Sequence, residues 1–215
     1  MPNTITLSSE TEAIKYLCQK DKRLAKVISS IGPISYQPYE DGYAFLVHEI
    51  IEQMLSVKAG AKIYERLETL CEGQITPDII NSLSDEEIRS IGTSSAKVSY
   101  IRSLTQAVNL GTLDFHSLPN MTDSEVMKAL TSIKGIGKWT AKMYLIFVLD
   151  RQDILPTEDV AFLQAYQWLY KTEDRNPENI QRKCKKWKPY SSIAARYLYR
   201  ALDGGFTKNE FHLYK

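Results

Sequence analysis

The stretch that decides the local fold is LTSIKGIGKWTAKMYLIFVL, residues Leu130–Leu149. One helical pattern ends near Ile133, Gly135 and Gly137 bracket a single isoleucine, and a new helix with apolar periodicity begins at once. Because glycine lacks a Cβ, two glycines this close allow a sharp turn and a close approach of the backbone to a ligand. The stretch therefore predicts two helices joined by a glycine hairpin.

The hairpin has the features of a phosphate-binding element. Its second helix presents N–H groups and the positive end of its dipole at the turn. Lys134, Lys138 and Lys142 add positive charge around it. Ile133 and Ile136 are expected to face inward and hold the two helices together. Most Gly-x-Gly sequences are ordinary turns, but a hairpin between helices and flanked by lysines favours DNA binding, in which phosphate contacts fix register without reading sequence.

The rest of the chain also predicts helices. Apolar residues recur at helical spacing. Ser9-x-x-Glu12, Ser84-x-x-Glu87 and Thr122-x-x-Glu125 have the form of capping boxes, and Asn176 precedes a proline at a helix start. No apolar–polar alternation is long enough to build a sheet, so the predicted fold class is all-α. The expected helices lie near residues 10–30, 42–54, 57–72, 77–81, 85–91, 94–109, 123–132, 137–149, 158–171, 177–186 and 191–202.

Composition is that of a globular protein. The 215 residues can bury one sizeable core or two small ones that share a cleft. No apolar run approaches the ~20 residues that span a bilayer, and the N-terminus lacks the pattern of a secretory signal, so we expect an intracellular protein. Cys18, Cys71 and Cys184 lie far apart in the sequence, which predicts reduced thiols and no zinc or iron–sulfur site.

Charge is distributed unevenly along the chain. The segment Lys171–Arg200 holds nine Lys or Arg residues against three acidic ones, whereas residues 1–120 are net acidic. A basic C-terminal third is consistent with a phosphate-facing surface. A solvated, charged helix is the alternative interpretation of the same segment.

Asp159 is the candidate acid downstream of the hairpin. It follows Gly137 by 22 residues and comes just after Pro156, at the start of the next expected helix. One helix and a return loop fill that spacing, so the carboxylate can come back toward the hairpin, and the dipole of the following helix stabilises its anionic form. An ordinary acid at a helix start is the alternative, and Glu158 and Asp153 fit that description equally well.

The run Tyr43–Arg66 contains an expected break. Ser56 can cap a second helix within it, which leaves Gln53, Met54 and Leu55 between two helices, where side chains can project outward. On the local sequence alone we favour the alternative, a continuous buried helix with Met54 as core filler.

Taken in order, these motifs resemble the helix-hairpin-helix DNA glycosylase superfamily, and within it the 3-methyladenine DNA glycosylase II (AlkA-like) branch. The resemblance covers roughly residues 10–205. Beyond the hairpin, it includes LVHEIIEQMLSVKAGAKIYERL (similar to the family's Gln-x-x-Ser segment), IRSIGTSSAKVSYIRSL, LPTED and WKPYSSIAARYLYR.

This resemblance implies a domain organisation. Residues 1–215 would form a single domain of two helical subdomains flanking a cleft, without the N-terminal β domain of the larger AlkA proteins. The central helical subdomain would cover residues 35–120. The second would combine residues 1–34 with 121–215 and would contain the hairpin, residues 130–149.

The resemblance also implies roles for individual residues. Asp159 matches the catalytic aspartate. Met54 falls where the family places a wedge that fills the gap left by an extruded nucleotide, which reverses the local preference for a core residue. The other implied DNA-binding residues are Gln53, Leu55, Lys134, Gly135, Gly137 and Lys138. The implied base pocket consists of Trp139, Met143, Val160 and Tyr199.

Trp139 decides the expected reaction. Relatives that also cleave the strand have a lysine at this place, which forms a Schiff base, whereas Lys138 is one residue early and on a different helix face. The resemblance thus implies a monofunctional enzyme of base excision repair that hydrolyses the N-glycosidic bond of alkylated purines, of the 3-methyladenine and 7-methylguanine type, in duplex DNA. Val160, Tyr199 and Ser191 depart from the residues usual in relatives, which leaves the range of lesions open.

No cofactor is expected to be required, although the resemblance implies a monovalent cation at the backbone carbonyls of Thr131, Ile133 and Ile136. The expected partner is double-stranded DNA that contains damaged bases, with no membrane, and the protein is expected to be a monomer. Its expected location is the cytoplasm, associated with the nucleoid in a prokaryote, or the nucleus in a eukaryote. The alternatives are a non-catalytic helix-hairpin-helix DNA-binding protein and a mismatch or oxidised-base glycosylase of the same fold.

Overall fold

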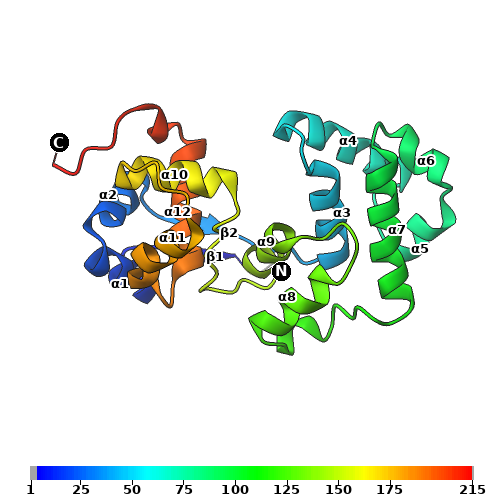
Figure 1. The fold of residues 1–215 in the computed structure, drawn as a ribbon, viewed down its shortest axis with the longest axis horizontal. Coiled ribbons are helices and arrows are strands. Elements are labelled where there is room, and N and C mark those ends of the chain that lie inside the picture. Colours follow the sequence, from blue (N-terminus) through cyan, green and yellow to red (C-terminus); the bar gives the residue numbers. More distant parts are fainter. Residues whose placement is uncertain (1–3, 215) are drawn as a thin grey trace. The chain divides into compact units, whose positions relative to one another are not determined.

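A computed structural model describes residues 4–214, and helices are the predominant elements of this part of the chain (Figure 1). The chain folds as two compact units. Unit 1 combines both ends of the chain, up to Pro38 and from Asp150 onward, and unit 2 is Tyr39–Leu149. The all-α fold class predicted from the sequence is confirmed. Across the described residues, no helix has the length and hydropathy that a bilayer crossing requires.

Unit 2 contains the predicted helix break and the hairpin. In α7 the buried residues Val98, Ile101 and Leu104 recur at the helical spacing that the sequence periodicity predicts, whereas α9 buries the consecutive residues 143–146. Its elements are α3 (Gly42–Glu52), α4 (Val57–Leu70), α5 (Pro77–Ser82), α6 (Asp85–Ser90), α7 (Ser95–Asn109), the 3-10 turn η1 (Leu118–Asn120), α8 (Asp123–Thr131) and α9 (Lys138–Phe147).

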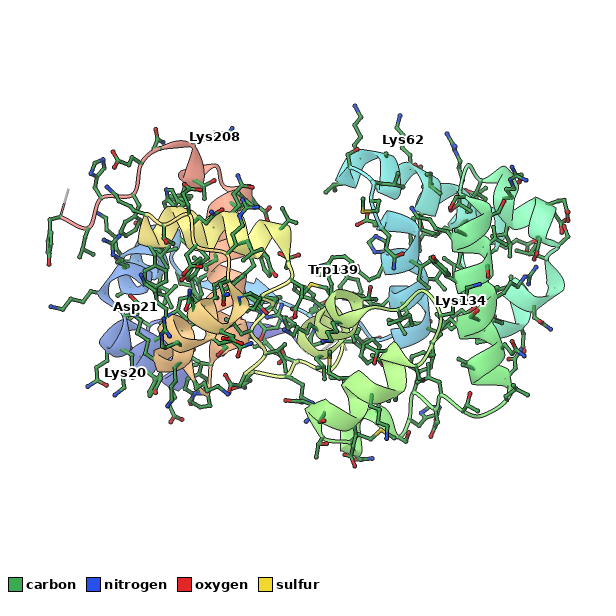
Figure 2. All side chains as sticks on the ribbon, in the orientation of Figure 1. Lys20, Asp21, Lys62, Lys134, Trp139 and Lys208 are labelled. Carbon is green, nitrogen blue, oxygen red and sulfur yellow. The ribbon has the colours of Figure 1, made fainter. Side chains whose placement is uncertain are left out.

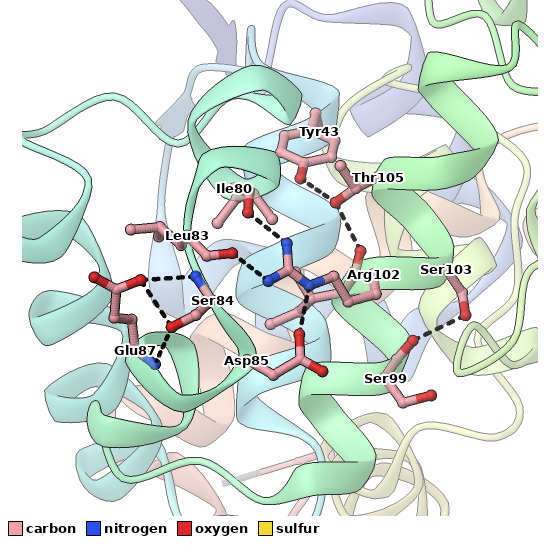
Figure 3. A network of polar contacts seen from close by, with 11 residues as sticks. Tyr43, Ile80, Leu83, Ser84, Asp85, Glu87, Ser99, Arg102, Ser103 and Thr105 are labelled. Atoms are coloured by element: carbon pink, nitrogen blue, oxygen red, sulfur yellow. Dashed lines mark hydrogen bonds and ion pairs between the residues drawn. The ribbon is translucent and has the colours of Figure 1, made fainter.

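The helix α7 is fixed in unit 2 by Arg102, as Figure 3 shows. The guanidinium donates to the carboxylate of Asp85 at 2.7 Å and to the carbonyl of Ile80 at 2.6 Å, and also to the carbonyl of Leu83. These bonds hold the ends of the short helices α5 and α6 against α7. The capping boxes predicted at Ser84 and Thr122 are present and start α6 and α8.

Unit 1 has its own hydrophobic core, formed mainly by α1, α2, α10 and α12. Its elements are β1 (Ile5–Leu7), α1 (Glu12–Lys20), α2 (Lys22–Ile31), β2 (Ile34–Tyr36), α10 (Val160–Tyr170), α11 (Pro177–Cys184), η2 (Lys185–Trp187), α12 (Ser191–Asp203) and η3 (Phe206–Lys208). The start predicted at Asn176 is confirmed, since the Asn176 side chain caps α11.

Two features of the N-terminal segment differ from the sequence-based prediction. β1 and β2 pair antiparallel, with Ile5 opposite Tyr36, and each strand is too short to show an alternating pattern. The proposed capping box at Ser9 does not form, because Thr11 is the residue before α1 and makes no side-chain cap.

The single helix predicted over residues 10–30 is broken at Asp21. This residue is only 3% exposed, and its Oδ1 accepts from the backbone N–H groups of Arg23 and Leu24, which starts α2. Its Oδ2 accepts from Tyr170, from Trp187 Nε1 at 2.9 Å and from Lys186 at 3.0 Å. Burial alone would raise the pKa of this carboxyl, but these hydrogen bonds outweigh burial and hold its pKa below the usual value.

The boundaries predicted for the two subdomains need one correction. The sequence-based prediction grouped the hairpin, residues 130–149, with the chain ends. The structure instead groups it with unit 2, because α9 packs on α3 and the backbone N–H of Tyr39 donates to the carbonyl of Phe147 at 2.9 Å. The hairpin and the helix break at Met54 therefore belong to one body.

Candidate functional site

The hairpin between α8 and α9 has the predicted form (Figures 1 and 2). The Ile136 N–H donates to the Ile133 carbonyl at 3.1 Å, which closes the turn, and both isoleucine side chains are buried as predicted. Gly135 has a φ of 93°, a left-handed conformation that favours glycine.

Gly135 also packs closely on α7. A Cβ placed at this residue would lie 2.2 Å from Cγ of Tyr100, well inside van der Waals contact. Gly137 is different, because its φ is −94° and a Cβ there would meet nothing within 4 Å. The first glycine is thus required by the turn and by the packing beneath it, whereas the second leaves open space above the start of α9.

The start of α9 is suited to bind an anion. Gly137 precedes the helix and provides no side-chain cap for its first N–H groups. Gly137 and Lys138 are exposed, and Lys134 is exposed and donates to the hydroxyl of Ser99 at 3.1 Å. Uncapped N–H groups, the helix dipole and two nearby ammonium groups together favour a phosphate at this position.

The break between α3 and α4 is a tight turn with Met54 at its tip. The Leu55 N–H donates to the Glu52 carbonyl at 3.0 Å. Gln53 has φ −48° and ψ 128°, and Met54 has a φ of 59°, as in a type II turn whose third residue is usually glycine. The Met54 side chain is 101% exposed, so the core-filler alternative is wrong. Ser56 caps α4 as predicted.

Gln53 connects this turn to the hairpin. Its side-chain Nε2 donates to the carbonyl of Gly135 at 2.9 Å, across 82 positions of sequence. No local pattern predicts this contact, because the two residues lie far apart in the chain.

The implied pocket residues of α9 lie on one face of that helix. Trp139, the second residue of the helix, is half-buried, and Met143, one turn later, is buried. Lys138 occupies the first position of α9 and is exposed, one residue away from the place that Trp139 takes.

Asp159 caps α10 in unit 1. Its Oδ1 accepts from the backbone N–H of Phe162 at 2.6 Å, and the side chain is 8% exposed. The dipole of α10 stabilises a carboxylate in this place. The two rival acids differ from it, because Glu158 is exposed and Asp153 accepts from the Ser191 hydroxyl at 2.5 Å and from Lys188 at 3.2 Å. Burial at a helix start distinguishes Asp159 from both.

The loop before Asp159 is anchored to the first turn of α12. The Ser192 hydroxyl accepts from the Ile154 N–H at 2.8 Å, and the Ser192 N–H donates to the Gln152 carbonyl at 2.9 Å. Ser191 adds its bond to Asp153. The segment WKPYSS therefore holds the loop that carries the acid, a function that its sequence did not reveal.

A second anchor lies at Asp150, where the loop begins. Asp150 has a φ of 49°, and its Oδ1 accepts from the Tyr36 hydroxyl at 3.0 Å and from Arg196 at 3.1 Å. The Arg196 guanidinium lies 3.7 Å from the centre of the Tyr36 ring. Burial lowers the pKa of Arg196. A buried arginine thus fixes the beginning of the Asp159 loop.

The remaining predicted residues are distributed between the two units. Val160 begins α10 and is 71% exposed, and Tyr199 lies half-buried on α12, both in unit 1 with Asp159. Trp139 and Met143 lie in unit 2. That these residues form one base pocket stays a prediction.

The implied cation site consists of backbone oxygens at the hairpin. The Ile133 carbonyl already accepts the N–H of Ile136. Uncharged carbonyl oxygens are suitable ligands for a monovalent cation, so the donor chemistry of Thr131, Ile133 and Ile136 fits the group that the resemblance implies.

Comparison with known proteins gives a consistent result. The sequence profile described as HhH-GPD superfamily base excision DNA repair protein matches residues 47–189. DNA-3-methyladenine glycosylase 1 of Schizosaccharomyces pombe is 28% identical over 183 residues, which cover 83% of this chain and 80% of the relative.

Solved structures agree with the sequence matches. The crystal structure of a DNA-3-methyladenine glycosidase from Bacillus halodurans has a TM-score of 0.85 and 34% identity, with 97% of each chain covered. The Schizosaccharomyces pombe 3-methyladenine DNA glycosylase in complex with abasic DNA has a TM-score of 0.80 and 27% identity, and covers 90% of this chain and 97% of that one.

Proposed function

Because the chain belongs to the HhH-GPD superfamily of base excision DNA repair proteins, we propose that it is a monofunctional DNA glycosylase that releases alkylated purines from duplex DNA. The observation that carries this proposal is the buried carboxylate of Asp159, which caps α10 on a loop anchored at both ends. The carboxylate is held in a fixed position at the start of α10, as the acid of the proposed reaction requires. The names of the relatives support the same substrate class.

Binding begins at the hairpin. The uncapped start of α9, with Gly137 and Lys138 exposed, receives a backbone phosphate, and Lys134 adds charge beside it. The carbonyls of Thr131, Ile133 and Ile136 would hold a monovalent cation, which would supply further positive charge at the hairpin. Contacts of this kind are independent of base sequence, as a search for damage requires.

Extrusion of the damaged nucleotide follows. Flipping a base out of the duplex costs roughly a few kcal/mol and costs least at damaged pairs. The exposed Met54 side chain enters the stack and occupies the gap, with Gln53 and Leu55 on either side of it. The proposed stacking partners of the flipped purine are the aromatic rings of Trp139 in unit 2 and Tyr199 in unit 1, and Met143 and Val160 are its proposed apolar contacts. For a cationic alkylated base the stacking contributes about 0.5–2 kcal/mol.

Asp159 then assists the departure of the base. Alkylation at N3 or N7 leaves a purine cationic, so the base leaves as a neutral molecule when the C1′–N bond breaks and takes both bonding electrons. The Asp159 carboxylate stabilises the positive charge that develops on the sugar, and it orients a water or accepts its proton as the water oxygen bonds to C1′. One acid is enough because the leaving group needs no protonation, whereas most glycosidases use two carboxylates.

We further propose that the protein acts as a monomer on damaged double-stranded DNA, in the nucleoid of a prokaryote or in the nucleus of a eukaryote.

Base release from a methylated duplex tests this function directly. We expect the purified chain to release 3-methyladenine and 7-methylguanine from DNA treated with a methylating agent, and to release little from duplexes with a mismatch or an oxidised guanine. Chromatography of the freed bases is the measurement. Release from the oxidised or mismatched duplex alone would replace the proposed substrate class, and tight binding without any release would favour a non-catalytic DNA-binding protein.

Borohydride trapping tests the absence of strand cleavage. Because Trp139 occupies the place at which lyase relatives have a lysine, no Schiff base should form, so reduction should leave no covalent adduct with DNA that contains an abasic site. Denaturing electrophoresis detects such adducts. A Trp139→Lys variant shows whether a lysine at position 139 can form the Schiff base. A trapped adduct in the wild-type protein, on Lys138 or elsewhere, would overturn the monofunctional assignment.

A further inference from the structure

The turn that carries Met54 and the phosphate-binding hairpin are joined by one side chain. Gln53 Nε2 donates to the Gly135 carbonyl at 2.9 Å, and both residues belong to unit 2. The peptide that follows this carbonyl is held on its other side as well, because the Ile136 N–H donates to the Ile133 carbonyl at 3.1 Å. The orientation of that hairpin peptide therefore depends directly on Gln53.

The turn itself is strained and needs support. Met54 has a φ of 59°, in the left-handed region. A residue other than glycine populates this conformation roughly tenfold less than its preferred ones. Its side chain is fully exposed, so it makes no packing contact that could hold the turn. Such conformations persist only where neighbouring contacts fix them.

Two contacts fix the residues before Met54. Lys97 of α7 donates to the Ile51 carbonyl at 2.7 Å, and Glu52 packs so closely on Gly60 of α4 that a Cβ there would lie 2.8 Å from its Cγ. Both contacts lie on the α3 side of the turn. At the tip, the Leu55 N–H bond to the Glu52 carbonyl closes the turn, and the Gln53 side chain connects the residue next to Met54 to the hairpin.

We infer that Gln53 is a positioning residue that sets Met54 relative to the bound phosphate. This inference rests on the proposed function. The hydrogen bond joins the turn and the hairpin into one rigid piece. When a phosphate binds at the start of α9, the Met54 side chain is therefore already positioned to enter the base stack, and the turn does not have to become ordered separately. Preorganisation of this kind improves binding affinity, because the loss of conformational entropy on ordering the turn does not occur during association with DNA.

A change in the donor alone tests this role. Gln53→Glu keeps the size of the side chain but replaces its amide donor with a carboxylate, which cannot donate to Gly135. Gln53→Met removes the polar group without adding charge. Gln106→Glu, on the exposed surface of α7, makes the same change in charge elsewhere in unit 2 and is the matched control.

The readout is unstacking of a fluorescent base, which needs no catalysis. A duplex carries 2-aminopurine next to a tetrahydrofuran analogue of an abasic site, and its fluorescence rises when Met54 enters the stack. We expect Gln53→Glu and Gln53→Met each to weaken this response about fivefold, measured as the protein concentration for half-maximal signal. Gln106→Glu should match the wild type.

A double-mutant cycle separates positioning from general damage, and it is read as affinity for the same duplex by fluorescence anisotropy, because Met54→Ala removes the side chain that produces the 2-aminopurine signal. If Gln53 acts through Met54, the Gln53→Met change should cost nothing further in a Met54→Ala background. An equal loss in both backgrounds, or a wild-type response from Gln53→Glu, would overturn the inference. The fluorescence probe contains no damaged base, so this assay does not depend on catalysis. A protein that failed to release methylated purines would contradict the proposed function, and the role of Gln53 would still be tested by the fluorescence and binding results.

Discussion

Asp159→Asn should slow the release of methylated purines by roughly 10²- to 10⁴-fold, the range expected when a positioned catalytic carboxylate is lost. The amide has the same shape but no negative charge, so it neither stabilises the charge developing on the sugar nor accepts a proton from water. Asparagine is as good an N-cap as aspartate, so the bond from the Phe162 N–H is retained and the fold is preserved.

Single-turnover base release measures the chemical step, and anisotropy with a labelled abasic duplex measures binding. We expect the binding of Asp159→Asn to equal that of the wild type. Glu158→Gln makes the same chemical change at the adjacent, exposed acid and should leave release within a few-fold of normal. Release at a near-normal rate by Asp159→Asn would end the assignment of this residue as the catalytic acid.

Gly135→Ala should be the most damaging single-methyl change in the hairpin. Alanine would be forced to a φ of 93° and its Cβ would lie 2.2 Å from Cγ of Tyr100. Backbone strain and overpacking together should lower the free energy of unfolding by about 2–4 kcal/mol. Because the same displacement moves the start of α9, we also expect affinity for duplex DNA to fall more than about tenfold.

Gly137→Ala is the matched comparison. Its φ of −94° suits alanine, and the added Cβ meets nothing within 4 Å, so urea unfolding should show a loss below about 1 kcal/mol. The new methyl group stands where the phosphate approaches, so DNA affinity should still fall. If both variants bound DNA as the wild type does, the hairpin would not be the phosphate site, whatever their stability.

Local signals explain what the sequence predicted correctly. The hairpin, the capped starts of α6, α8 and α11, and the cap at Ser56 depend on residues within a few positions of one another, so periodicity and capping chemistry were enough. The family and the all-α fold class followed from the same motifs and are confirmed.

The errors arose where partners lie far apart in the chain. At Asp21 a local cap on the N–H groups of Arg23 and Leu24 starts α2, but the buried carboxylate is also held by Tyr170 and Trp187, which lie 149 and 166 positions away and which no local pattern predicts. The exposure of Met54 depends on a turn that Lys97 and Gln53 restrain, so the local preference for a buried methionine was wrong. The same limit explains why the anchors of the Asp159 loop were missed.

Because the loop that carries Asp159 is anchored independently of Val160, the position of the acid and the surface of the neighbouring residue can change separately in evolution. The acid is fixed by Ser192 and Arg196, through contacts to backbone atoms and to Asp150, whereas Val160 on the next position projects its side chain to solvent. If Val160 contacts the base as proposed, substitutions at Val160 change which damaged base is accepted while the Asp159 carboxylate keeps its place. Lineages that meet different alkylating agents could diversify through such positions, with the chemical step inherited unchanged.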